Sequence, residues 1–378
     1  MSMKMRILQV TNYYAPAYSF GGPTRLLEIY ANMLRSRNFR VDVLTSDLLT
    51  RETCQGSKIL DLGDKGKIEY VHEPRWVYLT KKNIHLNFFL CLKIAVSIRK
   101  YDFVQLSEYR GLLPLVVIIF ASLFNTKIVH HSFGMISQKR GVKKKIYDFI
   151  FRRLFLKRVS ICFAENEEER LQYIEIGVDS YKIIVLPHPI MSDKSTDYVP
   201  RVPIEGKLDL CYVGRIHPNK GLGNCINLVY TLLNHFPNIS LTVMGNDDGD
   251  LENIKRKIKE LNLNEYIHFV RASYDETRFR LYRESDMFVI LPDDNLQTSL
   301  AAIEALATGT PIINNLNCKI EEWSEFACTI DGKSDVEIVD RIKKLLLIDR
   351  NYIATHVRKA HTFDSVGKVL DRTFCSCI

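Results

Sequence analysis

Two cations and a glycine stand close together in the chain, in a pattern that could bind an anion. Arg215 and Lys220 belong to the run Val213-Gly-Arg-Ile-His-Pro-Asn-Lys-Gly221, which follows an apolar stretch and precedes a helical pattern that begins near Leu222. Gly214 lets the backbone pass close to a ligand, Arg215 offers a planar fork of donors, and Lys220 brings a point charge to the start of a helix. The pattern predicts a diphosphate site, and an ordinary surface turn with two solvated cations is the alternative.

A carboxylate further along the chain could bind the hydroxyl groups of a ribose. Glu304 lies in an apolar helix expected over 297–308, directly after a strand-like run. Open α/β sheets bind ligands at the carboxyl ends of their strands, and a carboxylate there can accept two hydrogen bonds from vicinal hydroxyls. Backbone donors around Thr298, Ser299 and Leu300 are expected to face a phosphate or a sugar. The alternative is that Glu304 pairs with a neighbouring lysine.

Strand and helix patterns alternate along the chain, which predicts parallel sheets with helices on both faces. Strands are expected at 6–10, 41–45, 68–71, 103–106, 127–130, 160–163, 182–186, 208–213, 240–244, 266–270, 287–291 and 311–314. At 378 residues the chain exceeds one average domain, and prolines interrupt the pattern between 187 and 203. We therefore expect an α/β fold of two Rossmann-like β/α/β domains facing across a cleft, 1–190 and 191–350. A C-terminal helix over 351–378 is expected to pack back on the first domain.

Composition favours a cytoplasmic protein. The nine cysteines form no CxxC pair, which favours free thiols in a reducing compartment. The opening residues run directly into a strand pattern, so that no signal peptide is expected. The longest apolar run, 111–124, is too short to span a bilayer and contains Pro114, so we expect a buried helix there.

The net charge of +8 is concentrated in the first half of the chain. Residues 1–190 hold 29 Lys and Arg against 17 Asp and Glu, whereas the remainder holds 23 against 27. Nine of the cations lie in the stretch 139–158, interleaved with aromatic and aliphatic residues, and Asp148 is its one acid. This mixture suits an anionic lipid surface. A core-packing helix with a solvated basic side is the alternative, and nucleic acid is not expected because no reading motif accompanies the charge.

The order of these motifs resembles a known family. Gly214-Arg215 with Lys220-Gly221, then Asp286-Met-Phe-Val-Ile-Leu-Pro292 and Ile303-Glu-Ala-Leu-Ala-Thr-Gly-Thr-Pro-Ile-Ile313, are similar to the donor half of the retaining, nucleotide-sugar-dependent glycosyltransferases of family 4. The opening Ile7-Leu-Gln-Val-Thr-Asn-Tyr-Tyr-Ala-Pro16 with Gly21-Gly22 resembles the family's first strand and glycine loop. The resemblance implies the GT-B architecture of two facing Rossmann-like domains.

The resemblance also implies roles for individual residues. Arg215 and Lys220 would grip the donor diphosphate and neutralise charge on the leaving nucleotide, so that no metal and no other cofactor is required. Glu304 would hold the ribose, and Gly21 and Gly22 would let the first helix approach the donor phosphate or the acceptor. Base contacts are expected from the loop after Val270, which includes Arg271.

The sequence departs from the family's pattern at the sugar end of this site. The first acid of the paired-glutamate motif is replaced by Leu296, so that Asn295 or Asp294 would have to reach the sugar hydroxyls. The aromatic-glycine pair that normally follows is Thr298-Ser299, whose hydroxyls could cap a helix and add donors.

A histidine near the end of a middle strand is a further candidate. The run is His130-His-Ser-Phe-Gly-Met135, in which His131 is the first choice for a catalytic contact to the sugar and His130 the second. A structural histidine that bonds to the backbone is the alternative.

The implied reaction is the transfer of a hexosyl-type group, with retention, from a nucleotide-diphosphate sugar to an acceptor hydroxyl. We expect a glycan or lipid-linked glycan acceptor, in the synthesis of a bacterial capsule, O-antigen or exopolysaccharide. The enzyme would lie on the inner face of the plasma membrane as a peripheral protein, through 139–158. A nucleotide-sugar epimerase of the same fold and a non-catalytic nucleotide-sugar-binding scaffold remain alternatives.

Overall fold

The computed structural model describes residues 5–50, 53–74, 87–134, 136, 142–190, 204–293, 299–318 and 321–375. It divides the chain into two compact units, one made of Met1–Pro189 with Phe363–Ile378 and the other of Ile190–Thr362. Two helices, rather than one, occupy the stretch expected over 351–378. Helix α12 (Arg350–His361) ends the second unit, and only α13 (Phe363–Cys375) belongs to the first.

Within the described residues, the first unit is built on a sheet of eight strands in the order β3-β4-β2-β1-β5-β6-β7-β8. Neighbouring strands are parallel, except that β3 pairs antiparallel with β4. The strands are β1 (Arg6–Val10), β2 (Arg40–Ser46), β3 (Lys58–Asp61), β4 (Lys67–Val71), β5 (Phe103–Leu106), β6 (Lys127–His131), β7 (Val159–Ala164) and β8 (Ile183–Val185).

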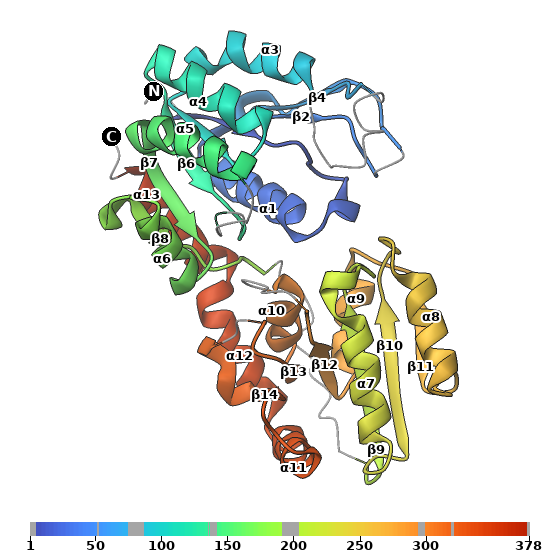
Figure 1. The fold of residues 1–378 in the computed structure, drawn as a ribbon. Helices are drawn as coiled ribbons and strands as arrows, with labels where there is room; N and C mark the ends of the chain where they lie inside the picture. The colour runs from blue at the N-terminus through green and yellow to red at the C-terminus, as the bar shows by residue number, and fades with distance from the viewer. Residues whose placement is uncertain are drawn as a thin grey trace. The chain divides into compact units, whose positions relative to one another are not determined.

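Helices cover both faces of this sheet. They are α1 (Gly22–Ser36), α3 (Phe88–Ser97), α4 (Leu112–Phe124), α5 (Val142–Arg158), α6 (Glu167–Glu175) and α13, with short 3-10 turns at η1 (Tyr18–Phe20), η2 (Gly63–Lys65), η3 (Ile98–Lys100) and η4 (Ser180–Lys182). Helices α3, α4 and α5 lie in a row on one face, whereas α1 and α13 pack together on the other (Figure 1). This division follows from right-handed crossovers that leave β1 in opposite directions.

Helix α13 is fixed to the first unit by an aromatic cluster and by ion pairs. Its Phe374 ring packs against Phe39, Phe103 and Phe163 at centroid distances of 5.5, 5.4 and 6.3 Å. Arg37 bonds to Asp371 at 3.0 Å and to Asp364 at 3.4 Å. The returning helix therefore completes the core of the first unit.

The second unit has a fully parallel sheet in the order β11-β10-β9-β12-β13-β14 among the described residues. Its strands are β9 (Lys207–Val213), β10 (Asn238–Met244), β11 (Ile267–Val270), β12 (Met287–Ile290), β13 (Ile312–Asn314) and β14 (Ala327–Thr329). Its helices are α7 (Leu222–Leu232), α8 (Leu251–Glu260), α9 (Glu276–Glu284), α10 (Leu300–Ala307), α11 (Asp335–Leu346) and α12, with 3-10 turns at η5 (Pro218–Lys220) and η6 (Glu321–Phe326).

The expected α/β architecture is confirmed, and each expected strand is present to within two residues at either end. Strands β3 and β14 were not predicted. All four residues of β3 are exposed, and β14 has only three residues, so neither produces the apolar run of a buried parallel strand. Helix α4 covers the apolar run expected to be a buried helix, yet Leu123 is 68% exposed.

Candidate functional site

The Arg215–Lys220 segment lies at the carboxyl edge of the second sheet. Strand β9 ends at Val213, and the Gly214 N–H donates to the carbonyl oxygen of Met244 at 3.0 Å. The chain then forms η5 and enters α7 through Gly221, as the pattern before Leu222 predicted. Both cations therefore stand between a strand end and the N-terminus of a helix, where backbone N–H groups favour anions.

Close backbone approaches at this edge require glycine. A Cβ on Gly221 would lie 1.7 Å from the carbonyl oxygen of Leu291, and a Cβ on Gly245 would lie 1.9 Å from that of Gly214. Gly221 also has a φ of 70°. The ends of β9, β10 and β12 are thus held together without side chains between them.

Replacing Gly221 with alanine is expected to destabilise the second unit more strongly than the same change at Gly332. Both residues have a φ of 70°, so both variants share the cost of a left-handed backbone, about 1–2 kcal/mol. Gly332 has open space around its missing Cβ, whereas Gly221 has the Leu291 carbonyl. Denaturant unfolding of the two variants measures the difference, and equal losses would contradict the close approach.

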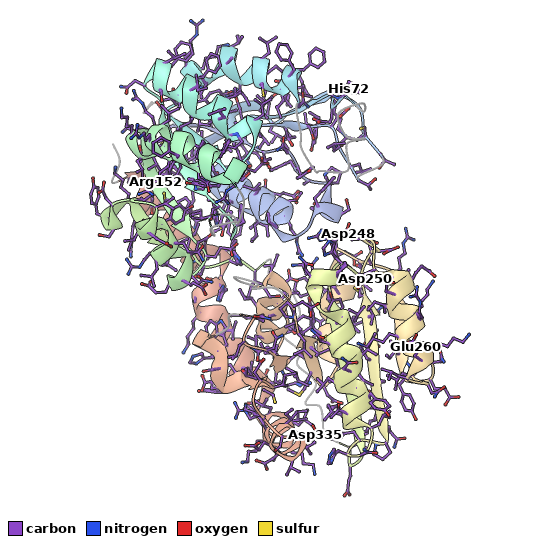
Figure 2. All side chains as sticks on the ribbon, viewed as in Figure 1. His72, Arg152, Asp248, Asp250, Glu260 and Asp335 are labelled. Atoms are coloured by element: carbon purple, nitrogen blue, oxygen red, sulfur yellow. The ribbon has the colours of Figure 1, made fainter. Side chains whose placement is uncertain are left out.

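Arg215 is held in place by a carboxylate from the next strand-helix loop. Its Nη1 lies 2.6 Å from Oδ2 of Asp248, which lies just before α8 (Figure 2). The Arg215 side chain is 31% exposed, so that part of the guanidinium faces solvent. An anchored guanidinium loses less conformational entropy on binding an anion.

Lys220 lies near the loop that follows β13. Burial raises the pKa of the Cys318 thiol to about 12, and the positive charge of Lys220 opposes that shift. Asn317 of the same loop donates to the carbonyl oxygens of Pro292 and Asp293 at 3.1 and 3.0 Å. The strand ends of β9, β12 and β13 therefore meet around Lys220.

Asn224, Asn317 and Asp248 were missed by the sequence analysis. The Asn224 amide donates to the Leu291 carbonyl at 2.9 Å and to Asp293 at 2.8 Å, and so fixes the end of β12 to α7. Asn and Asp residues are common in the loops that follow strands, so the sequence around these three residues did not indicate that they lie at this edge of the sheet.

Glu304 is buried against helix α9. It is 4% exposed, and its Oε2 lies 3.1 Å from Nε of Arg278 and 3.5 Å from the hydroxyl of Tyr282. Arg278 is itself 2% exposed. The ion pair is close, but the Nε–H of Arg278 is not aligned for a hydrogen bond to the carboxylate. The partner of Glu304 is thus an arginine 26 residues earlier in the chain, not a neighbouring lysine.

The structure describes only some of the other residues that were predicted to bind the nucleotide-sugar donor. Ser299 caps α10, because its hydroxyl accepts from the Ala302 N–H at 3.2 Å, and Leu300 is the first residue of that helix. Arg271 is exposed and follows the edge strand β11. Asn295 and Thr298, together with Asp294 and Leu296, lie outside the described residues.

Gly21 and Gly22 begin the first helix of the first unit. Gly21 is the N-cap of α1 with a φ of 110°, and Gly22 is its first residue. A positive φ at this point favours glycine, since side chains with a Cβ are strained there. The loop from β1 is tied to Glu108, which accepts from the Asn12 side-chain amide at 2.6 Å.

His130 and His131 differ in their partners. His130 contacts the Tyr173 hydroxyl at 2.7 Å and the Glu108 carbonyl at 3.3 Å, and burial lowers its pKa to about 3. His131 ends β6, is fully buried, and neither of its ring nitrogens has a hydrogen-bond partner among the described residues. Burial holds the pKa of His131 well below its usual value. The structural histidine is thus His130, and His131 keeps its hydrogen-bonding capacity.

The buried carboxyl group of Glu169 bonds to Ser132, the residue after His131, and was also missed by the sequence analysis. Glu169 accepts hydrogen bonds from the Ser132 hydroxyl, from the Gly134 N–H at 2.7 Å and from the Glu165 N–H at 2.7 Å. Burial, with the nearby charge of Glu165, raises the pKa of Glu169 to about 7. Ser132 and Gly134 follow β6 and lie at least 35 residues before Glu169 in the sequence, so no local pattern could have indicated the cluster.

Glu169 is expected to make stability depend on pH below neutrality. Because the folded protein binds this proton more tightly than the unfolded chain, the contribution is present below the unfolded pKa of 4.5 and is lost as the pH rises to about 7. The loss is on the order of 3 kcal/mol. Melting temperatures of the protein and of Glu169→Gln, compared between pH 5 and about 7.5, measure it. The wild type should lose stability relative to the variant, and parallel profiles would contradict the raised pKa.

The basic stretch 139–158 is described only in part. Residues 139–141 lie outside the described residues, and the side chains of 142–146 are not described. In the rest of α5, Phe151 and Phe155 are buried in the core, whereas Arg152, Arg153 and Lys157 are exposed. This arrangement agrees with a core-packing helix that has a solvated basic side.

The described residues contain neither a helix able to cross a membrane nor a cluster of metal ligands. None of the helices there has the length and apolar character needed to cross a membrane. No cluster of three or more His, Cys, Asp or Glu side chains in those same ranges is arranged to hold a metal ion. That the reaction requires no metal stays a prediction.

Known sequences match part of the chain. The family of glycosyl transferases group 1 matches residues 195–358. The chain is 25% identical over 211 residues to a D-inositol 3-phosphate glycosyltransferase of Corynebacterium urealyticum, covering 50% of this chain and 49% of that protein. It is 28% identical over 201 residues to the protein of the same name from Corynebacterium efficiens, covering 50% and 46%. The chain thus spans about half the length of the curated relatives that it matches.

Solved structures match both units. Sucrose-phosphate synthase from Thermosynechococcus elongatus superposes with a TM-score of 0.74 at 15% identity, over 99% of each chain. HepE of Anabaena in complex with UDP-glucose superposes with a TM-score of 0.70 at 14% identity, over 98% of this chain and 100% of that one. At these identities the likeness concerns the fold. Residues 195–358 thus match the family model of the glycosyl transferases group 1, and the chain as a whole has the fold of the GT-B glycosyltransferases.

Proposed function

We propose that this protein is a glycosyltransferase that moves a hexosyl-type group from a nucleotide-diphosphate sugar to an acceptor hydroxyl with retention of configuration. One observation carries the proposal: Arg215 and Lys220 stand together at a strand edge and a helix N-terminus, with Asp248 orienting the arginine. The bound UDP-glucose of HepE, a protein of the same fold, supports a nucleotide-sugar donor.

In the proposed reaction, the bond between the anomeric carbon and the diphosphate oxygen breaks, and negative charge grows on the leaving diphosphate. Arg215 and Lys220 stabilise that charge. This stabilisation is stronger in the transition state than in the bound donor, so it accelerates the reaction. The acceptor oxygen attacks the face that the diphosphate leaves, and a diphosphate oxygen takes the acceptor's proton. Attack on this face retains the configuration without a protein nucleophile.

The first unit is proposed to contact the sugar and the acceptor. His131 is neutral at physiological pH, because burial lowers its pKa, and a neutral imidazole can donate or accept one hydrogen bond at a sugar hydroxyl. Phe133 stacks on its ring at 3.9 Å and has a φ of 48°, a conformation that costs a non-glycine residue energy. Because His131 is fully buried, a sugar contact requires neighbouring side chains to move.

The acceptor is proposed to be a lipid-linked glycan of a bacterial surface polysaccharide, on the inner face of the plasma membrane. The exposed cations of α5 support this part of the proposal, since each Lys or Arg near an anionic membrane contributes about 1 kcal/mol.

Thermal-shift measurements with UDP-, GDP-, ADP- and dTDP-sugars test the donor assignment. One nucleotide should raise the melting temperature, because a ligand at a hundred times its Kd stabilises by about 2.7 kcal/mol. NMR of the product should then show retained anomeric configuration. Isomerised donor without an acceptor would indicate an epimerase, and binding without turnover a scaffold. No shift with any donor would overturn the assignment.

A further inference from the structure

Helix α3 turns apolar side chains toward solvent. Phe88, Phe89, Leu92 and Val96 are 67, 52, 53 and 62% exposed, and the buried residues of the helix are Leu90, Cys91 and Ile94. A helix that packs on a sheet ordinarily places polar residues on its outer face. The outer face of α3 instead carries these four apolar side chains beside one cation, Lys93.

Helix α4 adds to the same surface. It contains no charged residue, and Ile119, Leu123 and Phe124 are 40, 68 and 42% exposed. Helices α3 and α4 pack side by side at one end of the first unit, in the row that continues to α5 (Figure 1). We call these seven exposed residues of α3 and α4 the α3–α4 apolar surface. Contiguous apolar surfaces of this kind mark interaction sites.

The charges beside this surface are positive. Arg99 and Lys100 follow α3 directly and are exposed, and Arg153 and Lys157 are exposed on α5. Lys93 of α3 pairs with Glu69. Asp148, the one acid within α5, is bound by Arg110 at 2.8 Å. An apolar surface thus borders an excess of exposed cations.

We infer that the α3–α4 apolar surface docks on a lipid bilayer that carries anionic headgroups, an inference that rests on the proposed lipid-linked acceptor. The apolar side chains enter the boundary between headgroups and acyl chains, and the cations lie at the lipid phosphates. A second copy of the chain is a poorer occupant, because a two-fold interface would bring the like charges of both copies together.

This inference assigns different tasks to the two parts of the surface. Of the apolar residues of α5 that were expected to meet lipid, Phe151 and Phe155 are fully buried in the core, whereas Phe149 is 60% exposed. Helix α5 therefore supplies charge and one exposed ring, while α3 and α4 supply most of the apolar contact. Loss of charge should weaken binding in a salt-dependent way, and loss of the apolar residues should weaken it at any salt concentration.

Cosedimentation with vesicles of phosphatidylcholine and phosphatidylglycerol tests the inference. The variant Phe88→Ser/Leu92→Gln/Leu123→Gln is expected to bind these vesicles about tenfold more weakly than the wild type. Leu171→Gln/Tyr181→Ser/Leu347→Gln is the matched control, since it removes three side chains that are 55, 80 and 79% exposed elsewhere. The control should bind like the wild type, and vesicles of phosphatidylcholine alone should bind the wild type less.

Equal binding by the α3–α4 variant and the wild type would overturn the inference. So would a concentration-dependent dimer in solution that this variant abolishes, because the surface would then hold a second copy. Thermal shift with the donor is measured on the same samples. A retained shift in a variant that has lost vesicle binding supports the inference, whereas a wild type that shows no shift contradicts the donor assignment instead.

Discussion

Arg215→Ala is expected to lower the rate of sugar transfer by a factor of about 10²–10³, the loss found when one preorganised donor to a developing negative charge is removed. Arg215 is anchored to Asp248 at 2.6 Å, so its guanidinium is already oriented before the donor binds. The loss should appear in kcat, because the diphosphate gains charge as the glycosidic bond breaks. Steady-state kinetics with the donor identified by thermal shift provide the measurement.

Two further variants sharpen this test. Arg215→Lys keeps the charge but loses the planar fork, so that an intermediate rate is expected. Lys344→Ala is the control: this residue is exposed on α11 and pairs with Asp340 at 2.7 Å, and the activity of the variant should equal that of the wild type. Melting temperatures of all three show whether they are folded. A folded Arg215→Ala enzyme with wild-type kcat would remove Arg215 from the mechanism.

The sequence could predict the sheets because a parallel strand covered by helices reads as a short apolar run. Met287–Ile290 of β12 is of this kind. A strand of this kind can be identified from a few consecutive residues. The exposed edge strand β3 lacks an apolar pattern, and the antiparallel pairing that forms it is decided by contact with β4. The division of 351–378 into two helices was also missed, because α12 and α13 are separated at Thr362 without a glycine or a proline.

In the candidate site, too, the features that depend on contacts between distant parts of the chain could not be predicted. Arg215 and Lys220 were identified because only four residues separate them and a strand and a helix flank them, so that local spacing places them together. The positioning partner of Arg215 comes from another element, since Asp248 lies in the loop after β10. Glu304 was identified by its helix, yet its partner Arg278 lies on α9. Contacts between distant elements are set by packing, which a single sequence does not display.

Arg278→Met is expected to destabilise the second unit by about 3–5 kcal/mol, because it leaves the Glu304 carboxylate buried without its cation. The double variant Arg278→Met/Glu304→Leu should recover most of that loss, since an apolar pair of similar volume can replace a buried ion pair at little cost. Trp323 reports on this region, because it lies in the same hydrophobic cluster as Tyr282 and Ile303. Its fluorescence, in a Trp76→Phe background, follows denaturant unfolding of the three proteins.

The double variant also separates the structural role of Glu304 from its proposed role as the ribose ligand. If Glu304 holds the ribose, the recovered protein should be stable yet show a donor-induced thermal shift far below that of the wild type. A ribose bound through two hydrogen bonds to a charged group would lose about 1.5–3 kcal/mol for each. If this variant showed the thermal shift of the wild type, Glu304 would have no role in binding the ribose, and its role would be the ion pair with Arg278. Because stability and donor binding are measured on the same protein, unfolding cannot be mistaken for loss of the ligand contact.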